Sequence, residues 1–473
     1  MELIELTELT ELTLRQASEL LAAGETSAVE LLEATLRQID ATEPLVHAYA
    51  YVAADQARAA AATADQERAR GVDRGPVHGI PVGIKDLLYT TDMPTEAGSK
   101  VYAGFAPAFE ATAVQRLREA GAVIVGKTVT HEFAYGQDVP PTRNAWNQEC
   151  YPGGSSAGSG VAVAVRSAFG ALGSDTGASI RIPGSVNGVV GVKPTFGRVS
   201  RHGVVGMSPS LDHVGPLART VEDAALLLGA VAGHDPADLA SLDAPNEDFT
   251  RELDGGADGL RIGVDRDYYF SHFVTDEVRA ATLEAIDELE HQGATIVDVR
   301  IDELQLMSDV GLILVLTDTS DYHRMLLRAH ASDYTPGVRL MLELGNLVPA
   351  TTYLVAQRAR ASMREAVRKT FHDHHLDALA APTIPTTTMP LDQLSVAPGD
   401  GEESVFAMFL HHNIPSNLTG QPALSVPCGF SSEELPIGLQ LIGRPLEEAR
   451  LFRIARAYER ANPLFERRPP VAG

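Results

Sequence analysis

The chain has 473 residues, of which 44% are hydrophobic and 21% charged, a balance that excludes a disordered chain and allows a sizeable core. Its 63 acidic and 38 basic side chains give a net charge of −25, which disfavours nucleic-acid binding because phosphate contacts need clustered Lys and Arg. The two cysteines, Cys150 and Cys428, are too few for a disulfide framework or a four-thiolate zinc site and fit a reducing cytoplasm.

The N-terminal sequence, in which the triplet ELT recurs from Glu5 to Thr13, is acidic and has no long apolar run. It therefore predicts neither a secretory signal nor a transit peptide. The longest apolar run, Val310–Leu316, is far shorter than the roughly 18 residues that cross a membrane. We expect a cytoplasmic protein that does not enter a membrane.

Helices are predicted in the first part of the chain. One runs to Ala23 and ends at Gly24, and the next begins with a capping box from Ser27 to Glu30 and ends at Pro44. The Ala-rich stretch 53–70 predicts a surface helix. The apolar face of the second helix is formed by Val29, Leu32, Leu36 and Ile39.

Strands and helices then alternate, which predicts an α/β sheet covered by helices. The predicted strands are 78–84, 122–126, 260–264 and 294–299, and the predicted helices are 112–120 and 276–292. Apolar runs at 423–426 and 437–442 predict strands that return to the same sheet. We therefore expect one domain, 1–473, with N-terminal helices over about 1–70 and a divergent pocket insertion over about 265–403.

Two glycine- and serine-rich segments stand out. Gly153–Gly160 contains four Gly and three Ser, and a second segment covers Gly173–Arg181. Glycine allows close approach and positive φ, and successive amides with hydroxyls can bind an anion or form an oxyanion hole beside a nucleophile. A plain flexible loop is the alternative. A nucleotide-binding loop is disfavoured, because neither G-x-x-x-x-G-K-[ST] nor G-x-G-x-x-G is present.

Two serine mechanisms remain open at this point. Gly154–Gly158 matches the esterase pattern G-x-S-x-G with Ser156 as nucleophile, although the residues before it make a poor strand. Alternatively, a neutral lysine serves as the base, because burial lowers the pKa of a lysine. Lys85 follows the apolar segment 79–84 and is the candidate, unless it faces solvent at the end of a strand.

Several segments together resemble the amidase signature hydrolases. The segments that carry the resemblance are Gly79–Asp86, Gly153–Gly160, Gly173–Pro183, Gly188–Thr195, Gly197–Ser200, Leu211–Thr220, Asn417–Pro427 and Pro436–Gly443. The likeness covers nearly the whole chain and is weakest between about Asp265 and Glu403. It implies an α/β fold with a single large mixed β-sheet covered by helices on both faces.

The resemblance also implies a Ser–cis-Ser–Lys triad, with Lys85 as base, Ser155 as the bridging serine after a cis peptide, and Ser179 as nucleophile. No cofactor belongs to this mechanism. The implied oxyanion amides are those of Thr176, Gly177, Ala178 and Ser179. The implied braces are Ser156, Asp175 and Arg181. Ala178 replaces the usual family glycine, and alanine tolerates positive φ poorly, so either position 178 has an ordinary φ or the oxyanion hole is slightly altered.

The 15 histidines do not predict a metal site, because no H-E-x-x-H motif occurs and the densest groups, His372–His375 and His411–His412, lack ligand spacing. The segment His131–Gly136 also recurs in the resembling family and is expected to shape the pocket wall.

We therefore expect an amidohydrolase that cleaves the C–N bond of small carboxamides through a serine acyl-enzyme, with acyl esters, hydrazides and carbamates open as substrates. Residues that choose the substrate are expected at Leu312–Leu347 and Phe406–Asn413. No nucleic-acid or membrane partner is expected, and a homodimer is left open. The alternatives are a glutamine-hydrolysing A-type subunit of a tRNA-dependent amidotransferase, an esterase that uses Ser156, and a non-catalytic scaffold.

Overall fold

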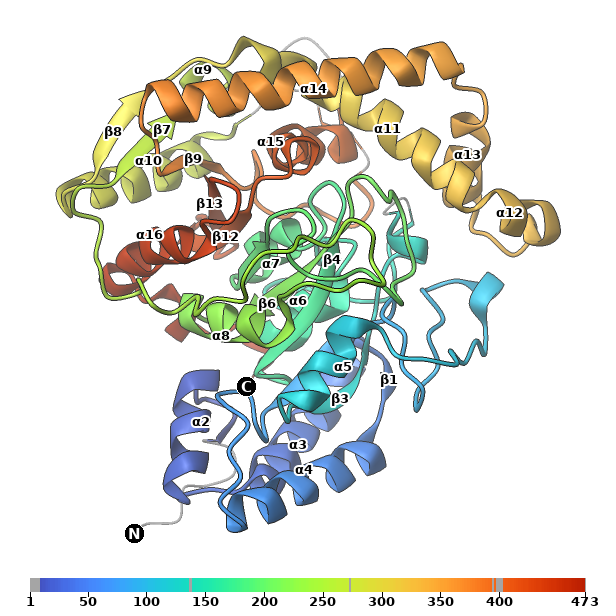
Figure 1. The fold of residues 1–473 in the computed structure, drawn as a ribbon, viewed down its shortest axis with the longest axis vertical. Coiled ribbons are helices and arrows are strands. Elements are labelled where there is room, and N and C mark those ends of the chain that lie inside the picture. The colour runs from blue at the N-terminus through green and yellow to red at the C-terminus, as the bar shows by residue number, and fades with distance from the viewer. Residues whose placement is uncertain (1–8, 136–137, 272–273, 394, 397–402, 473) are drawn as a thin grey trace.

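One mixed β-sheet of eleven strands runs through the molecule, in the order β1-β3-β2-β4-β6-β5-β12-β13-β9-β7-β8 (Figure 1). Its strands are β1 (Tyr49–Val52), β2 (Pro81–Lys85), β3 (Val123–Thr128), β4 (Gly170–Asp175), β5 (Val190–Lys193), β6 (His213–Ala218), β7 (Arg261–Val264), β8 (Thr295–Asp298), β9 (Ala378–Pro382), β12 (Ala423–Phe430) and β13 (Pro436–Gly443). Strand β2 is parallel to β3 and β4, and β7 is parallel to β8 and β9, whereas the other neighbours are antiparallel. A separate two-stranded sheet pairs β10 (Ser395–Val396) with β11 (Glu403–Ser404).

The computed structural model describes residues 9–135, 138–271, 274–393, 395–396 and 403–472. Positions 5–8 of the ELT repeat and Gly136 of the segment His131–Gly136 lie outside the described residues. The predicted single mixed sheet is confirmed, and the strands after Asn417 do return to it, because β12 pairs with β5 of the first half.

Helices cover both faces of this sheet, as predicted. Helices α6 and α7 pack together on one face, and α8, α10 and α16 pack on the other, with α5 beside α8. The α-helices are α2 (Leu14–Ala23), α3 (Ala28–Val46), α4 (Ala54–Ala69), α5 (Thr112–Glu119), α6 (Ala157–Ala164), α7 (Arg181–Asn187), α8 (Val221–Val231), α9 (Arg266–Tyr269), α10 (Asp276–His291), α11 (Met307–Tyr322), α12 (Arg324–His330), α13 (Pro336–Gly345), α14 (Ala350–Asp373), α15 (Val405–Thr419) and α16 (Glu448–Ala461). The 3-10 helices are Lys100–Tyr102, Glu132–Ala134, Asp302–Leu306, Leu464–Glu466 and Pro470–Ala472.

The N-terminal helices follow their sequence signals closely. Helix α2 ends at Gly24, which adopts φ 70°, and α3 begins with the predicted capping box at Ser27. Two details were wrong. Helix α3 continues past Pro44 to Val46. The fixed φ of proline is compatible with helical geometry, and so near the end of the helix its missing N–H costs only one hydrogen bond. Val29, expected on the buried face, is 37% exposed.

The region 265–403 contains two kinds of structure. Helix α10 and strands β8 and β9 belong to the layers of the main sheet, whereas α11, α12, α13 and α14 form a layer that lies beside it (Figure 1). The apolar run Val310–Leu316 lies within α11, which packs against α13, α14 and α15. No helix among the described residues is long and apolar enough to cross a membrane.

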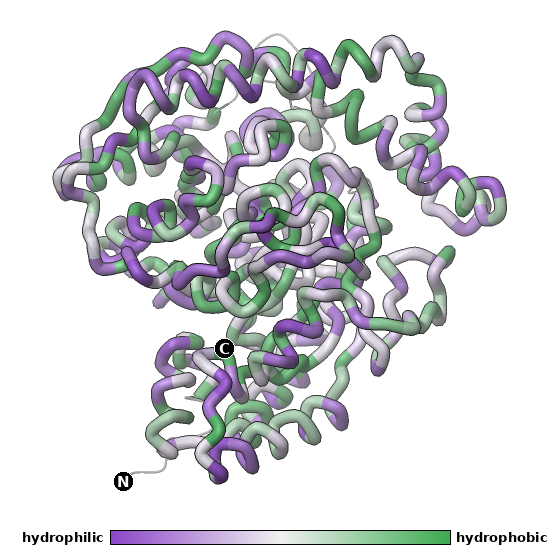
Figure 2. The backbone as a smooth tube through the Cα atoms, in the orientation of Figure 1, coloured by the Kyte–Doolittle hydropathy of each residue, from purple (hydrophilic) through white to green (hydrophobic). Residues whose placement is uncertain are grey.

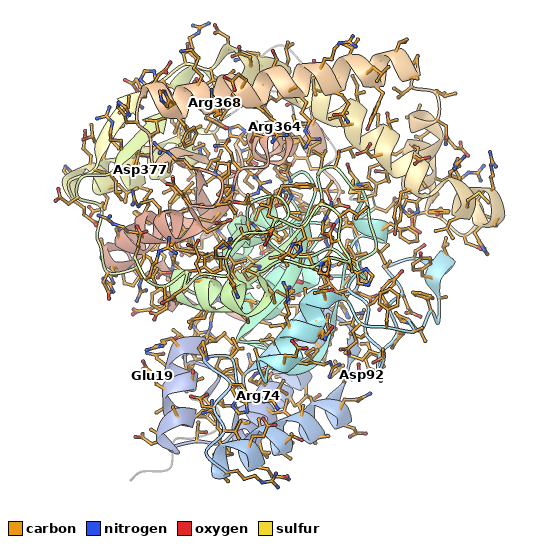
Figure 3. The ribbon with its side chains drawn as sticks, in the orientation of Figure 1. Glu19, Arg74, Asp92, Arg364, Arg368 and Asp377 are labelled. Atoms are coloured by element: carbon orange, nitrogen blue, oxygen red, sulfur yellow. The ribbon has the colours of Figure 1, made fainter. Side chains whose placement is uncertain are left out.

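Hydrophobic segments concentrate in the central strands and the helices next to them, whereas α14 alternates between polar and apolar positions (Figure 2). Charged side chains such as Glu19, Arg74 and Arg364 extend from the outer helices and loops (Figure 3). Four large cationic side chains are exceptions, because they are fully buried. They are Lys85, Lys127, Arg181 and Lys193.

Candidate active site

Lys85 lies at the end of strand β2, beside the parallel strand β4, so both strands deliver their carboxyl ends to one edge of the sheet. Its fully buried Nζ donates to Ser155 Oγ at 2.7 Å and to Ser174 Oγ at 2.9 Å. Among the described residues no carboxylate lies within ion-pair distance of this ammonium. Burial lowers the pKa of Lys85 to about 7, although the charges of Asp175 and Asp212 oppose that shift. Lys85 can therefore lose its proton near neutrality.

The peptide bond between Gly154 and Ser155 is cis, as expected before Ser155. Two glycines allow the chain to pass here. Gly153 has φ 79°, and a Cβ on it would lie 2.6 Å from the Cα of Pro183. A Cβ on Gly154 would lie 2.3 Å from Cε1 of His131. The density of glycine in this segment thus follows from close packing around Ser155.

Ser156 does not occupy a nucleophile elbow. No strand is formed by residues 151–156, and Ser156 directly precedes α6. Its fully buried Oγ donates to the carbonyl of Ser174 at 3.1 Å and accepts from the Ser174 amide at 3.2 Å. Its own amide donates to the carbonyl of Ser179 at 3.1 Å. This serine therefore joins the two glycine-rich segments and has no free face toward a substrate.

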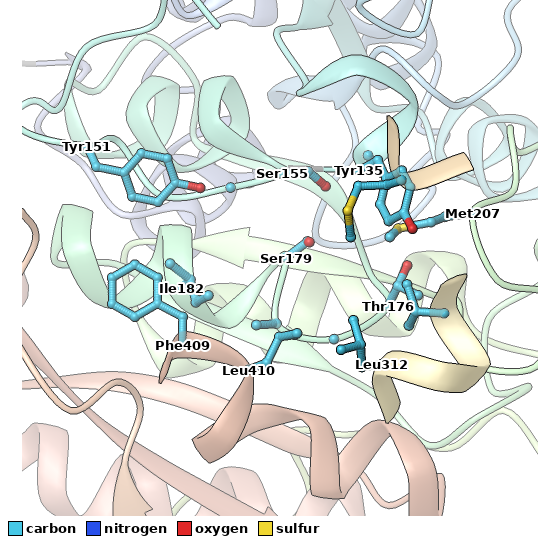
Figure 4. A pocket seen from close by; sticks show the side chains of 16 residues that line it. Tyr135, Tyr151, Ser155, Thr176, Ser179, Ile182, Met207, Leu312, Phe409 and Leu410 are labelled. Atoms are coloured by element: carbon cyan, nitrogen blue, oxygen red, sulfur yellow. The ribbon is translucent and has the colours of Figure 1, made fainter. Parts of the chain in front are cut away.

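Ser179 lies in the turn that connects β4 with α7. Its hydroxyl and that of Ser155 face the space between them in the pocket (Figure 4). The amides of the preceding turn have no hydrogen-bond acceptor among the residues that the structure describes. These unpartnered amides are those of Thr176, Gly177, Ala178 and Ser179. A row of free N–H groups beside a serine hydroxyl is the arrangement that binds an oxyanion.

Ala178 fits this turn without strain. Its φ is not positive, so the alanine in place of the family glycine needs no left-handed backbone. The methyl group joins a small buried apolar cluster at the pocket wall that includes Ile182 and Phe409. A Cβ on Gly177, in contrast, would lie 2.7 Å from Cδ2 of Leu410, so a larger residue there would require the Leu410 side chain to move.

Asp175 and Arg181, both fully buried, brace the turn from behind. Arg181 Nε and Nη2 donate to the two carboxylate oxygens at 3.1 and 2.9 Å, and the amide of Ile180 donates to the same carboxylate at 3.1 Å. Burial opposes ionisation of Asp175, but the guanidinium holds its pKa below the ordinary value. Asn417 Nδ2 also donates to Asp175 at 2.9 Å, which ties the turn to α15.

The pocket in front of Ser179 has mostly apolar walls (Figure 4). Helices α11, α13 and α15 contribute five of its residues, which lie within the two segments expected to choose the substrate. These five are Leu312, Val315, Met341, Phe409 and Leu410. The remaining lining residues are Ala134, Tyr135, Tyr151, Gly154, Ser155, Thr176, Gly177, Ala178, Ser179, Ile182 and Met207.

The segment from His131 forms part of this wall through Ala134 and Tyr135, as expected. His131 itself lies behind the pocket, where its amide donates to the carbonyl of Ser155 at 3.2 Å. Burial and the nearby Lys85 lower its pKa to about 3, so the imidazole is neutral. Throughout the described ranges, no group of three His, Cys, Asp or Glu side chains is placed to hold a metal ion.

Comparison with known proteins finds relatives that match nearly the whole chain. The chain is 43% identical to an amidase of Pseudomonas putida, with 98% of each chain covered. It is 41% identical to a glutamyl-tRNA(Gln) amidotransferase subunit of Chloroflexus aggregans, with 99% of this chain and 100% of the other covered. The native peptide amidase of Stenotrophomonas maltophilia superposes with a TM-score of 0.84 at 32% identity, covering 97% and 98%.

The family model named Amidase matches residues 30–452. The chain therefore belongs to the amidase family, the amidase signature enzymes.

Sequence reasoning missed several residues of the site. Ser174 accepts from Lys85, and it lies inside the segment Gly173–Arg181 without having been assigned a role. Asp212 belongs to the resembling segment Leu211–Thr220, and its carboxylate accepts from the hydroxyl of Thr176. Tyr151 and Met207 line the pocket, and nothing in their sequence surroundings distinguishes them from ordinary loop residues.

Proposed function

We propose that this protein is an amidohydrolase that cleaves small carboxamides through an acyl-enzyme on Ser179. The observation that carries this proposal is the fully buried Lys85 Nζ, which lies 2.7 Å from Ser155 Oγ and whose pKa burial lowers to about 7. A buried amine that can be neutral and contacts a hydroxyl is suited to be a general base. Its position beside Ser179 and a row of free amides supplies the other parts of an acyl-transfer site.

In the proposed reaction, neutral Lys85 removes the proton of Ser155 while Ser155 removes the proton of Ser179. The Oγ of Ser179 then forms a bond with the carbonyl carbon, and the amides of residues 176–179 bind the oxyanion. When the C–N bond breaks, the proton returns from Lys85 through Ser155 to the leaving nitrogen. Water next repeats the same proton transfers on the acyl-enzyme, releases the carboxylic acid and restores Ser179.

The pocket supports an apolar acyl group. None of its described lining residues carries an ionisable carboxylate, amine, guanidinium or imidazole. Aliphatic and aromatic walls of this kind bind the apolar part of a substrate, while the few polar atoms orient its reacting bond. Acyl esters, hydrazides and carbamates place the same carbonyl before Ser179 and belong to the same proposed substrate range.

A glutamine-hydrolysing subunit of a tRNA-dependent amidotransferase is the second candidate, and the relative from Chloroflexus aggregans supports it. The pocket supports it less well. Glutamine carries an ammonium and a carboxylate at neutral pH, and charges that leave water need charged or hydrogen-bonded partners. The described pocket walls offer no charged side chain, and the net charge of −25 disfavours direct contact with tRNA.

Turnover by the isolated chain separates these candidates. The purified protein should be incubated with aliphatic and aryl amides, esters, hydrazides, carbamates and glutamine, and the released amine, alcohol or acid measured. We expect hydrolysis of apolar carboxamides that is lost in Ser179→Ala and unchanged by a chelator. Glutaminase activity without activity on apolar amides would favour the role in a tRNA-dependent amidotransferase. An activity that a chelator removes and zinc restores would contradict the proposed mechanism.

A further inference from the structure

We propose that Asp212 is a positioning residue, which holds the oxyanion turn and connects it with helix α11 in the wall of the pocket. This inference rests on the proposed function, because the turn needs an accurate position only if Ser179 forms a tetrahedral intermediate. Asp212 lies in the loop before β6, and neither the proton relay nor the pocket lining accounts for its contacts.

The first link is the bond between Asp212 and the oxyanion turn. Thr176 Oγ1 donates to Asp212 Oδ1 at 2.6 Å, and Thr176 is the first of the four residues whose amides are free. The carboxylate is itself fixed, because the amides of Met207 and Ser208 donate to it at 2.9 and 3.0 Å. Asp212 therefore helps to fix the position of Thr176, the residue at which the turn leaves strand β4.

The second link leads from the same loop to helix α11. Ser208 Oγ and Ser210 Oγ both donate to Asp318 Oδ2, at 2.6 and 2.8 Å. Tyr353 of α14 donates its hydroxyl to the other oxygen of Asp318 at 3.1 Å. Asp318 thus anchors α11 to the loop that carries Asp212.

Through these hydrogen bonds, helix α11 in the pocket wall is connected with the oxyanion turn. Asp318 follows Val315 by about one helical turn and Leu312 by about two, and both of those side chains line the pocket. A displacement of α11 would therefore be transmitted through Ser208 and Asp212 to Thr176. A shift of about 1 Å in a reacting group can reduce a rate about 10²-fold. These hydrogen bonds are therefore expected to affect the rate of turnover.

The charge of Asp212 acts on the pKa of Lys85, so its removal should change the pH dependence of activity, which loss of a purely structural residue would not. Three titratable side chains interact electrostatically with Lys85. The charges of Asp175 and Asp212 favour its protonated form, whereas His131 is neutral. Removing the Asp212 charge should make Lys85 easier to deprotonate. The acid limb of the activity profile should then move to lower pH, although the maximal rate falls.

The test compares Asp212→Asn with Asp235→Asn in the full chain. Asp235 is a matched control, because its buried carboxylate also accepts from Thr112 Oγ1, Ser200 Oγ and a backbone amide, at 2.6, 2.5 and 2.8 Å. None of those groups lines the pocket that contains Ser179. For Asp212→Asn we expect kcat on an apolar amide to fall about 10- to 100-fold, with KM changed less than about threefold and the acid limb shifted downward. Asp235→Asn should retain kcat and the wild-type limb, whatever its effect on Tm.

Thr176→Val keeps the amide but removes the hydroxyl, and it serves if Asp212→Asn does not fold. It should lower kcat in the same range without moving the acid limb, since the Asp212 charge remains. Labelling of Ser179 by a fluorophosphonate gives an independent measure of the wild type. If the wild type neither turns over nor is labelled, the proposed function fails and the positioning role fails with it. If the wild type is active and both variants keep its kcat, the positioning role alone is wrong.

Discussion

The sites of Lys85 and Lys127 lie on neighbouring parallel strands, β2 and β3, and differ in one decisive respect. Both lysines are fully buried, and burial lowers the pKa of both. Lys127 Nζ lies 3.2 Å from the Asp86 carboxylate and donates to the carbonyl of Leu88 and the hydroxyl of Thr95 at 2.7 Å. Lys85 donates to two serine hydroxyls and, among the described residues, pairs with no carboxylate.

The comparison shows that burial of a lysine does not by itself make a base. A carboxylate partner keeps an ammonium charged and turns the pair into a structural link, and loss of either partner leaves a charge without compensation. A hydroxyl partner leaves the amine free to become neutral and offers it a proton to exchange. Under the proposed mechanism, the two neighbouring strands use the same residue type for stability and for chemistry.

The largest effect is expected at the end of the proposed relay that begins at Lys85. Ser179→Ala removes the attacking oxygen and leaves the Lys85–Ser155 contact in place, so the fold should be unchanged. We expect turnover to fall about 10⁴-fold or more, as when a nucleophile is removed from other serine hydrolases. Steady-state rates with Tm as the folding control measure this, and Ser179→Ala activity near that of the wild type would end the assignment.

The next prediction tests the comparison itself. Lys85→Met keeps the stem and removes the amine, and Lys85→Arg keeps a charge that cannot be lost. Both should reduce turnover by about 10²–10⁴-fold, and Lys85→Met should not lower Tm, because it removes a polar group that is costly to bury. A folded Lys85→Met that kept more than about a tenth of the activity would disprove the role as base.

The matched variant is Lys127→Met, which leaves Asp86 buried without its partner. We expect a loss of about 3–5 kcal/mol in the free energy of unfolding, with turnover per folded molecule nearly unchanged. Asp86→Asn combined with Lys127→Met should recover part of that loss, because no unpaired charge remains. Denaturant unfolding and active-site titration would measure the two quantities separately. If Lys85→Met and Lys127→Met reduced activity equally, the proposed distinction between a catalytic and a structural lysine would be wrong.

The pH profile gives an effect of intermediate size. Protonated Lys85 cannot accept the Ser155 proton, so turnover requires the neutral form. Since burial lowers the pKa of Lys85 to about 7, kcat/KM should rise with pH through about 7 and then reach a plateau. The neutral imidazole of His131 should add no second limb there. A profile that falls as pH rises through this range would contradict the relay.

Much of the fold was predictable because its signals are local. The capping box of α3, the apolar strands β2 and β3 and the glycine stop at Gly24 each depend on a few neighbouring residues. The order of the strands was not predictable, because neighbours such as β5 and β12 are distant in sequence.

The site divides in the same way. Lys85 was a candidate base because an apolar run precedes it, whereas Ser155 and Ser179 were assigned because their glycine-rich segments resemble those of the amidase signature hydrolases. Asp212 and Asp318 were missed, because an isolated Asp in a loop or on a helix is an ordinary surface residue by sequence. Their roles arise from packing between the loop before β6 and α11, which tertiary structure alone determines.

Among the residues of the glycine-rich segments, the smallest effect on activity is expected next to the bridging serine, at Ser156. Like Lys85, it contacts Ser174, but it bonds to the backbone of Ser174 and not to its hydroxyl. Ser156→Ala leaves the amide and carbonyl of Ser174 without those bonds, which should lower the free energy of unfolding by about 1–3 kcal/mol. Because Lys85, Ser155 and Ser179 keep their contacts, turnover per folded molecule should stay within about tenfold of the wild type, whereas Ser155→Ala should lose the proton relay. An esterase that used Ser156 as nucleophile predicts the reverse order of the two variants. Their relative rates on one amide and one ester therefore decide which of the adjacent serines takes part in the reaction.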